Sequence, residues 1–204
     1  MRFDEDDDDD DKPDESQRGK QDDPLFMGVA KALYKSRTVL IFGEIDTKIA
    51  ERTTAHLLAL AYEGKDDIKV IINSQGGHVE SGDTICDMIK FVGPRVKVLA
   101  SGWVASMGAM IYLSAAKENR YCLPNTRIML HQPLGGVGGR ASDIAIEAKE
   151  IIKMRERINR QIADATGQPV DRVAKDTDRN FWMGPEEAKA YGAVSHIISS
   201  AREF

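Results

Sequence analysis

The chain has 204 residues, of which 42% are hydrophobic and 30% charged, a composition that suits one compact domain with or without a tail. Its net charge of -5 is unevenly distributed, because residues 1–26 contain twelve acidic and four basic side chains whereas the remainder contains 21 acidic and 24 basic ones. The nearly neutral body excludes a strongly basic surface for nucleic acid, which needs clustered Lys and Arg side chains.

Residues 1–26 form an acidic segment with few apolar side chains. Besides Met1, its only large apolar residues are Phe3, Leu25 and Phe26. A segment of this kind buries too little apolar surface to offset the entropy lost on ordering. We therefore expect residues 1–26 to be a disordered tail and residues 27–204 to form the folded domain.

Strand-like and helix-like stretches alternate after the tail. The expected strands, defined by short apolar runs, lie at 38–42, 68–73, 96–100, 121–123 and 127–130. The expected helices, defined by apolar residues three and four positions apart, lie at 47–63, 79–92, 105–116 and 144–166. This alternation is typical of βαβ units, so the sequence predicts an α/β fold with a mainly parallel sheet covered by helices on both faces.

The sequence favours a protein of the cytoplasm. Its acidic start differs from the basic start of a secretory or transit peptide. Cys86 and Cys122 lie 36 residues apart without CxxC or CxxH spacing, so neither a disulfide framework nor a zinc site is indicated. Residues 98–116 carry no charge and are long enough to span a bilayer, but their serines and glycines argue against a membrane segment. We expect neither a membrane partner nor a bound metal.

Three candidate functional motifs follow predicted strands, and parallel sheets bind ligands beyond the carboxyl ends of their strands. They are the pair Gly76-Gly77, the serine Ser106 and the histidine His131. Ser106 lies in a strand-to-helix turn among small residues, a position that suits an accessible nucleophile. Serine is also a preferred helix N-cap, so the sequence leaves both interpretations open.

His131 is the first candidate for a general base. It ends a predicted strand, which offers a fixed position from which a ring nitrogen reaches a serine hydroxyl. A structural histidine is the alternative at this position. His78 is a second candidate because it adjoins Gly77, whereas we expect His56 and His196 to be surface or structural residues.

The motifs, taken in order and with their spacing, resemble the proteolytic subunits of the Clp protease family (ClpP). Gly77 precedes Ser106 by 29 residues and His131 follows Ser106 by 25 residues. The sequence Met129-Leu130-His131-Gln132-Pro133-Leu134-Gly135-Gly136 and the sequences at 123–125 and 176–179 also match. The resemblance covers about residues 39–199, nearly the whole predicted domain.

The resemblance implies a crotonase-like spiral of ββα units and a serine endopeptidase. Two stacked heptamers, a tetradecamer, would enclose the active sites, and a ring AAA+ ATPase of the Clp type would feed in unfolded polypeptides. ATP would be used by that partner, so no cofactor is expected on this chain. A mixed ring with a paralogue is the alternative to a homomeric one.

The resemblance also implies roles for individual residues. Ser106 would be the nucleophile, His131 the general base and then acid, and the backbone N–H groups of Gly77 and Met107 the oxyanion hole. The remaining expected residues are Val79, Leu134 and Gly135 for binding substrate as an added strand, and Asp178 and Arg179 for the contact between rings.

The chain departs from the family where the third catalytic residue is expected. The family has an aspartate 49 residues after the histidine, and this chain has Asn180. An asparagine carbonyl still orients the ring of His131 but adds no negative charge to stabilise the imidazolium. Our hypothesis is an active but slow peptidase in which Asn180 orients His131. The alternatives are a silent structural subunit of a mixed ring and a crotonase-type acyl-CoA enzyme, which has no use for the pair of Ser106 and His131.

The N-terminal segment departs from the family as well. The family begins with a short, partly apolar loop at the axial pore, whereas this chain begins with the acidic tail. Several such tails would create a negative field near the pore and repel acidic substrates. A passive tail that only aids solubility is the alternative.

Overall fold

The computed structural model describes residues 24–133 and 138–204, and its contacts divide the chain into two units, Met1–Ser36 and Arg37–Phe204. The described element of the first unit is helix α2 (Pro24–Lys35). It begins at a proline, which suits the first helical position because its missing N–H has no partner there. The last three residues of the expected tail are therefore helical, and the rest of that tail lies outside the described residues.

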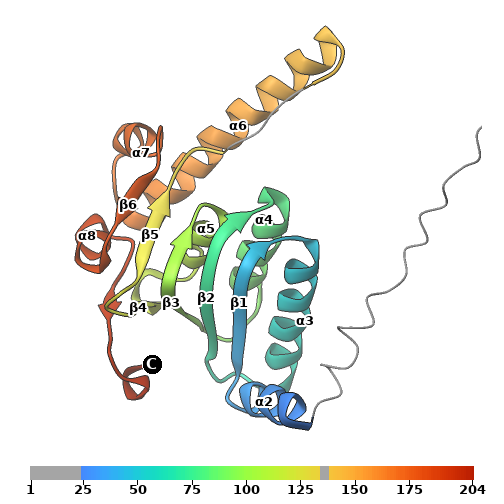
Figure 1. The fold of residues 1–204 in the computed structure, drawn as a ribbon, viewed down its shortest axis with the longest axis vertical. Coiled ribbons are helices and arrows are strands. Elements are labelled where there is room, and N and C mark those ends of the chain that lie inside the picture. The colour runs from blue at the N-terminus through green and yellow to red at the C-terminus, as the bar shows by residue number, and fades with distance from the viewer. Residues whose placement is uncertain (1–23, 134–137) are drawn as a thin grey trace, which may run out of the picture. The chain divides into compact units, whose positions relative to one another are not determined.

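Within the described residues, the second unit is built on seven strands that form one sheet (Figure 1). In chain order these are β1 (Thr38–Ile45), β2 (Ile68–Gly77), β3 (Val96–Ala105), β4 (Arg120–Cys122), β5 (Arg127–Leu130), β6 (Phe181–Met183) and β7 (His196–Ile197). The main order is β1-β2-β3-β4-β7, with β5 paired to β3 and β6. The β5-β6 pair is antiparallel and the other pairs are parallel, so the predicted mainly parallel α/β sheet is confirmed.

Helices connect the strands, and the apolar spacing predicted, to within a few residues, those that begin at Thr47, Val79, Met107 and Ala141 but not those that begin at Val170 and Pro185. They are α3 (Thr47–Glu63), α4 (Val79–Phe91), α5 (Met107–Leu113), α6 (Ala141–Thr166), α7 (Val170–Asp176) and α8 (Pro185–Tyr191), with short 3-10 helices at Lys117–Asn119 and Ala201–Glu203. The uncharged stretch 98–116 divides between the end of β3 and α5. Across the described ranges, none of the helices combines the length and the apolar character that crossing a membrane requires.

The expectation that helices cover both faces of the sheet is wrong for β1. Val39 and Ile41 are buried on one face, whereas Leu40 and Phe42 on the other face are 37% and 48% exposed. The chain moves from β1 to β2 to β3 in one direction along the sheet. Right-handed crossovers that advance in one direction place their helices on the same face, which explains why α3, α4 and α5 share one side (Figure 1).

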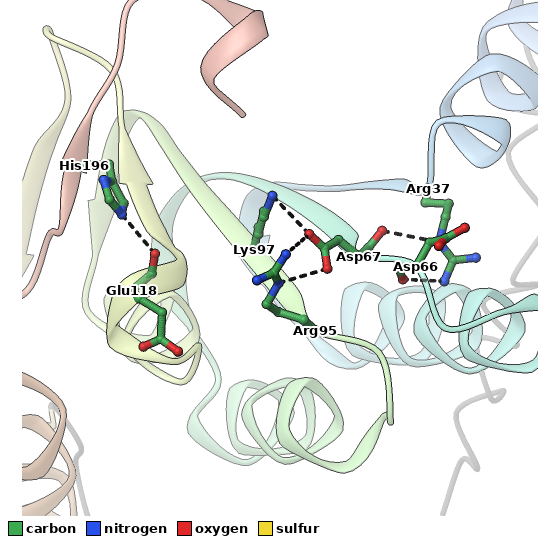
Figure 2. A network of polar contacts seen from close by, with 7 residues as sticks. All are labelled: Arg37, Asp66, Asp67, Arg95, Lys97, Glu118 and His196. Carbon is green, nitrogen blue, oxygen red and sulfur yellow. Dashed lines mark hydrogen bonds and ion pairs between the residues drawn. The ribbon is translucent and has the colours of Figure 1, made fainter.

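A polar cluster aligns the amino ends of the first three strands (Figure 2). Arg95 donates from Nε to Oδ1 of Asp67 at 2.9 Å, and Lys97 Nζ lies 3.0 Å from Oδ2 of the same carboxylate. Arg37 donates from Nε to the carbonyl oxygen of Asp67 at 3.3 Å. The hydrogen bond from Arg95 is the main cause that lowers the pKa of Asp67 to about 2. These contacts hold the first residues of β1, β2 and β3 next to one another.

The carboxyl ends of β2 and β3 extend beyond the apolar runs that predicted them. β2 continues to Gly77, where its end pairs with Ile45 of β1, and β3 continues to Ala105. The strand ends therefore lead directly into the glycine pair and into Ser106. Buried aliphatic side chains such as Ile72 and Val104 hold these ends to the core beneath α5.

Candidate active site

Ser106 and His131 are brought together by the pairing of β3 with β5. The two strands are parallel, and Ala105 pairs with Met129, so the residues after each strand leave the sheet side by side. The result is a distance of 2.7 Å between Ser106 Oγ and His131 Nε2. A serine hydroxyl at this distance from a ring nitrogen is positioned to give up its proton on attack.

The backbone of Ser106 has an uncommon conformation. Its φ is +55° and its ψ is -124°, which an L-residue adopts only when the surrounding structure holds it there. Ser106 occupies the N-cap position of α5, but its hydroxyl makes no capping hydrogen bond. The alternative of a simple helix cap is therefore wrong, because the hydroxyl is directed to His131.

Gly76 leaves room for the backbone of the serine turn. A Cβ atom on Gly76 would lie 2.6 Å from Cβ of Ser106 and 3.0 Å from the backbone nitrogen of Met107. Gly76 has a φ of +99° and Gly77 a φ of +150°, both of which favour glycine. Gly77 packs closely on Ile45 of β1. The sequence resemblance assigned Gly77 to the oxyanion hole. Of the two glycines, however, Gly76 is the one that lies closest to Ser106.

Ser74 is a site residue that the sequence did not reveal. It is fully buried on β2, and its Oγ donates to the carbonyl oxygen of Gly43 at 2.6 Å and accepts from the N–H of Gly76 at 3.0 Å. Gly108 on α5 packs against it, since a Cβ there would lie 3.0 Å from the Ser74 carbonyl oxygen. Ser74 thus holds the end of β2, which contains Gly76 and Gly77, to β1 and to the start of α5.

The environment of His131 favours the neutral form of its ring. Burial lowers the pKa of His131 below its ordinary value, because the charged form loses hydration, and the side chain of Asn180 acts in the opposite direction as a hydrogen-bond partner. The structure therefore brings Ser106 and His131 into contact, and it places the side chain of Asn180 close enough to affect the pKa of His131. A neutral imidazole is the form that accepts a proton.

His78, the second candidate for the base, is engaged elsewhere. Its Nδ1 lies 2.9 Å from Ser81 Oγ and its Nε2 lies 3.1 Å from Glu80 Oε2. It caps the N-terminus of α4, and its side chain is directed to that helix. His196 stacks on Tyr121, as expected for a structural residue.

Two of the residues expected to bind substrate, Leu134 and Gly135, lie outside the described residues. Val79, the third, lies at the start of α4. With Ser106 and His131 it lines a cavity of about 20 Å³. The other lining residues, which are mostly apolar, are Met107, Met110, Leu130, Pro133, Ile158 and Ile162.

Asp178, expected at a contact between rings, has partners within the chain. Its Oδ1 lies 3.4 Å from Arg155 on α6, and its carbonyl oxygen accepts from Gln132 Nε2 at 2.8 Å. Gln132 also donates its backbone N–H to the carbonyl oxygen of Thr177 at 2.7 Å. These bonds tie the residue after His131 to the turn that leads to Asn180. Arg179 is exposed beside them.

The two cysteines are poor candidates for a second nucleophile. Cys86 and Cys122 are both buried and free. Burial raises the pKa of Cys86 to about 12 and that of Cys122 to about 11, so neither is a thiolate near neutral pH. Among the described residues, no group of three or more His, Cys, Asp or Glu side chains gathers as metal ligands would.

Comparisons with known proteins point to one family. Residues 21–201 match the family model of Clp protease. The ATP-dependent Clp protease proteolytic subunit 3 of Rhizobium meliloti (strain 1021) is 56% identical over 191 residues, which cover 94% of this chain and 98% of the relative. The ATP-dependent Clp protease proteolytic subunit 2 of Gluconobacter oxydans (strain 621H) is 59% identical over 174 residues, which cover 84% of this chain and 78% of the relative.

Solved structures agree with these relatives. ClpP1 from Listeria monocytogenes is 56% identical with a TM-score of 0.78, covering 86% of this chain and 98% of that one. An asparagine-to-aspartate mutant of ClpP1 from the same organism has a TM-score of 0.80 at 56% identity, covering 85% of this chain and 98% of that one.

Proposed function

The chain belongs to the Clp protease family, as a proteolytic subunit with the activity of a serine peptidase, and we propose that Ser106, His131 and Asn180 form its catalytic site. The observation that carries the proposal is the 2.7 Å contact between Ser106 Oγ and His131 Nε2 on a strained turn. A hydroxyl held in this way toward a neutral imidazole suits nucleophilic attack better than it suits a structural hydrogen bond.

Acyl transfer follows from this arrangement. Ser106 Oγ attacks the carbonyl carbon of the scissile peptide bond while His131 Nε2 takes the hydroxyl proton. The carbonyl oxygen becomes an oxyanion, for which we assign the backbone N–H groups of Met107 and Gly77 as donors. One donor of this kind typically contributes about 3 kcal/mol to the transition state. The C–N bond then breaks as His131 returns the proton to the leaving amine.

Deacylation uses the same groups in reverse. A water molecule takes the place of the amine, gives a proton to His131 and attacks the ester carbon of the acylated Ser106. When the C–O bond to Ser106 breaks, His131 returns the proton to the serine oxygen. Proton transfer and backbone donors suffice for both steps, so the chain itself needs no cofactor.

Asn180 acts on the orientation of His131. Its side chain supports the ring as a hydrogen-bond partner and raises the pKa of His131, against the effect of burial. Without a carboxylate, the imidazolium formed during attack gains less stabilisation than in an aspartate triad. The proposed enzyme is therefore active but slow until its site is fully aligned.

The assembly belongs to the same proposal. Family membership supports an oligomer of stacked rings and a Clp-type ring ATPase that uses ATP and supplies unfolded chains. The substrate would bind as an added strand beside Val79, a mode that tolerates many sequences because backbone groups make the contacts. The cytoplasm suits two buried free cysteines.

The second candidate is a silent structural subunit of a mixed ring. Asn180 is the observation in its favour, and several curated relatives are named as numbered subunits 2 and 3. Such a subunit has no need of a nucleophile. The close pairing of Ser106 with His131 and the glycines packed around it support the peptidase instead.

Labelling with a fluorophosphonate probe tests the proposal. The full-length protein, shown by native mass measurement to be assembled, is labelled beside the variants Ser106→Ala and His131→Ala, and the modified residue is read by mass spectrometry. We expect labelling at Ser106 that requires His131. Assembled protein without labelling would favour the structural subunit.

A further inference from the structure

The cavity beside Ser106 is small and bordered by two methionines. Its volume is about 20 Å³, and Met107 and Met110 form part of its wall with Ile158 and Ile162. A cavity of this size holds about one water-sized group. The size of the substrate side chain that enters therefore depends on where the methionine side chains of the wall lie, because methionine is the wall residue that adapts most readily.

Gly82 on α4 packs against the side chain of Met107. A Cβ atom on Gly82 would lie 2.5 Å from Cε, 2.6 Å from Cγ and 3.2 Å from Sδ of Met107. Gly82 and Met107 are both buried, with Met107 only 3% exposed. The Met107 side chain thus occupies the space that any other residue at position 82 would fill.

The backbone at Met107 is less free to move than its side chain. Its nitrogen lies against Gly76, where an added Cβ would come within 3.0 Å, and the next residue, Gly108, packs on Ser74 of β2. A change at position 82 is therefore taken up by the Met107 side chain. The free space that adjoins this side chain is the cavity beside Ser106.

We propose that Gly82 determines the specificity of cleavage by letting Met107 withdraw onto α4, which keeps the pocket beside Ser106 open to apolar side chains. This inference rests on the proposed peptidase function and assigns the pocket to the substrate side chain next to the scissile bond. Gly82 touches neither substrate nor reacting atoms, so it is a positioning residue.

A double-mutant cycle in the assembled full-length protein tests this assignment. The variants are Gly82→Ala, Met107→Ala and the double variant, and the substrates are fluorogenic peptides that differ only in Leu or Ala before the scissile bond. We expect Gly82→Ala to lower the Leu-to-Ala ratio of kcat/KM by about tenfold, the usual scale for one or two methylene groups in an apolar pocket. In the Met107→Ala background, which lacks all three crowded atoms, the same change should leave the ratio unaltered.

Two controls separate a specificity effect from a general one. Gly93→Ala is the matched variant, because a Cβ there has no neighbour within 4 Å, and the Leu-to-Ala ratio should stay as in the parent. The rate of Ser106 labelling by a small fluorophosphonate should stay within about twofold in Gly82→Ala, because the probe leaves the pocket empty. An unchanged peptide ratio in Gly82→Ala, or a tenfold fall that Met107→Ala does not relieve, would overturn the proposal.

A spectroscopic measurement keeps the test independent of catalysis. With the methionine methyl groups labelled with ¹³C, the Met107 resonance should shift in Gly82→Ala and stay in place in Gly93→Ala. If the parent protein neither labels at Ser106 nor cleaves peptides, the peptidase function fails while a shifted Met107 resonance still supports the packing argument. An unshifted Met107 resonance would overturn the proposed role of Gly82, whether or not the enzyme is active.

Discussion

The backbone N–H of Ser106 donates to the carbonyl oxygen of Met129 at 3.0 Å. This bond continues the β3-β5 pairing by one residue. It places Ser106 beside Met129, which precedes His131 by two residues. The nucleophile and its base are therefore positioned by sheet register rather than by loop conformation. Sites on regular elements keep their geometry better than sites on loops.

Replacement of Asn180 by Asp should raise peptide hydrolysis. A carboxylate would stabilise the imidazolium that forms at His131 during attack, and the reverse exchange costs about 10⁴-fold in turnover in the serine-protease template. We expect a gain in kcat of about tenfold or more, measured with a short fluorogenic peptide on the assembled protein. The control is Asn180→Ala, which should lower kcat. Equal or lower activity in Asn180→Asp would contradict the role given to Asn180.

The pH dependence of kcat/KM should show an acid limb below the ordinary range of histidine. Burial lowers the pKa of His131, so the neutral base persists as the pH falls and activity is lost only when the pH drops through this lowered pKa. In Asn180→Asp the negative charge favours the imidazolium, so the limb should move to higher pH. A limb that stays in the same place in both proteins would show that His131 is not the titrating base.

Much of the fold and the central pair of the site were predictable from the sequence. Apolar runs and helical spacing predicted α3 to the residue and placed His131 directly after a strand. The strand predicted before Ser106 ended at residue 100, five residues short of the end of β3. The true length of β2 was not predictable in this way. Its last residues, from Ser74 to Gly77, are small or polar, and pairing with β1 imposes their strand conformation.

The residues that the sequence did not reveal act through tertiary contacts. Ser74 and Gly76 meet the serine turn only after β2 and β3 pair, and Gly82 meets Met107 only after α4 packs on α5. The one signal in the sequence for these residues was the number of glycines near the motifs. The interpretation of Ser106 as a cap failed for the same reason, since the direction of its hydroxyl depends on β5.

Ser74→Ala should reduce both stability and turnover. The change removes the acceptor of the Gly76 N–H and the donor to the Gly43 carbonyl, and a buried polar group left without a partner costs about 1–3 kcal/mol. We expect a comparable fall in the free energy of unfolding, measured with urea, and a fall in kcat larger than the change in KM. Ser101→Ala, at a half-buried serine on β3, is the control that should change neither by much. A stable Ser74→Ala enzyme with full kcat would show that Ser74 does not hold Gly76 and Gly77 in place.

Asp67→Asn should destabilise the protein in a way that depends on pH. Because the hydrogen bond from Arg95 lowers the pKa of Asp67 to about 2, below its ordinary value of 3.8, the ionised carboxylate favours the folded state above pH 3.8. That contribution is fully present near neutral pH and is lost as the pH falls from about 5 towards 2. The Asp67 side chain is 28% exposed, and solvent screening limits the effect to about 1 kcal/mol. Urea unfolding should therefore separate Asp67→Asn from the parent more strongly at pH 7 than at pH 3. The control is Asp66→Asn, since Asp66 accepts from Arg37 through its backbone carbonyl, which the substitution keeps. An equal loss of stability at both pH values would mean that the carboxylate charge is not what aligns β2 with β3.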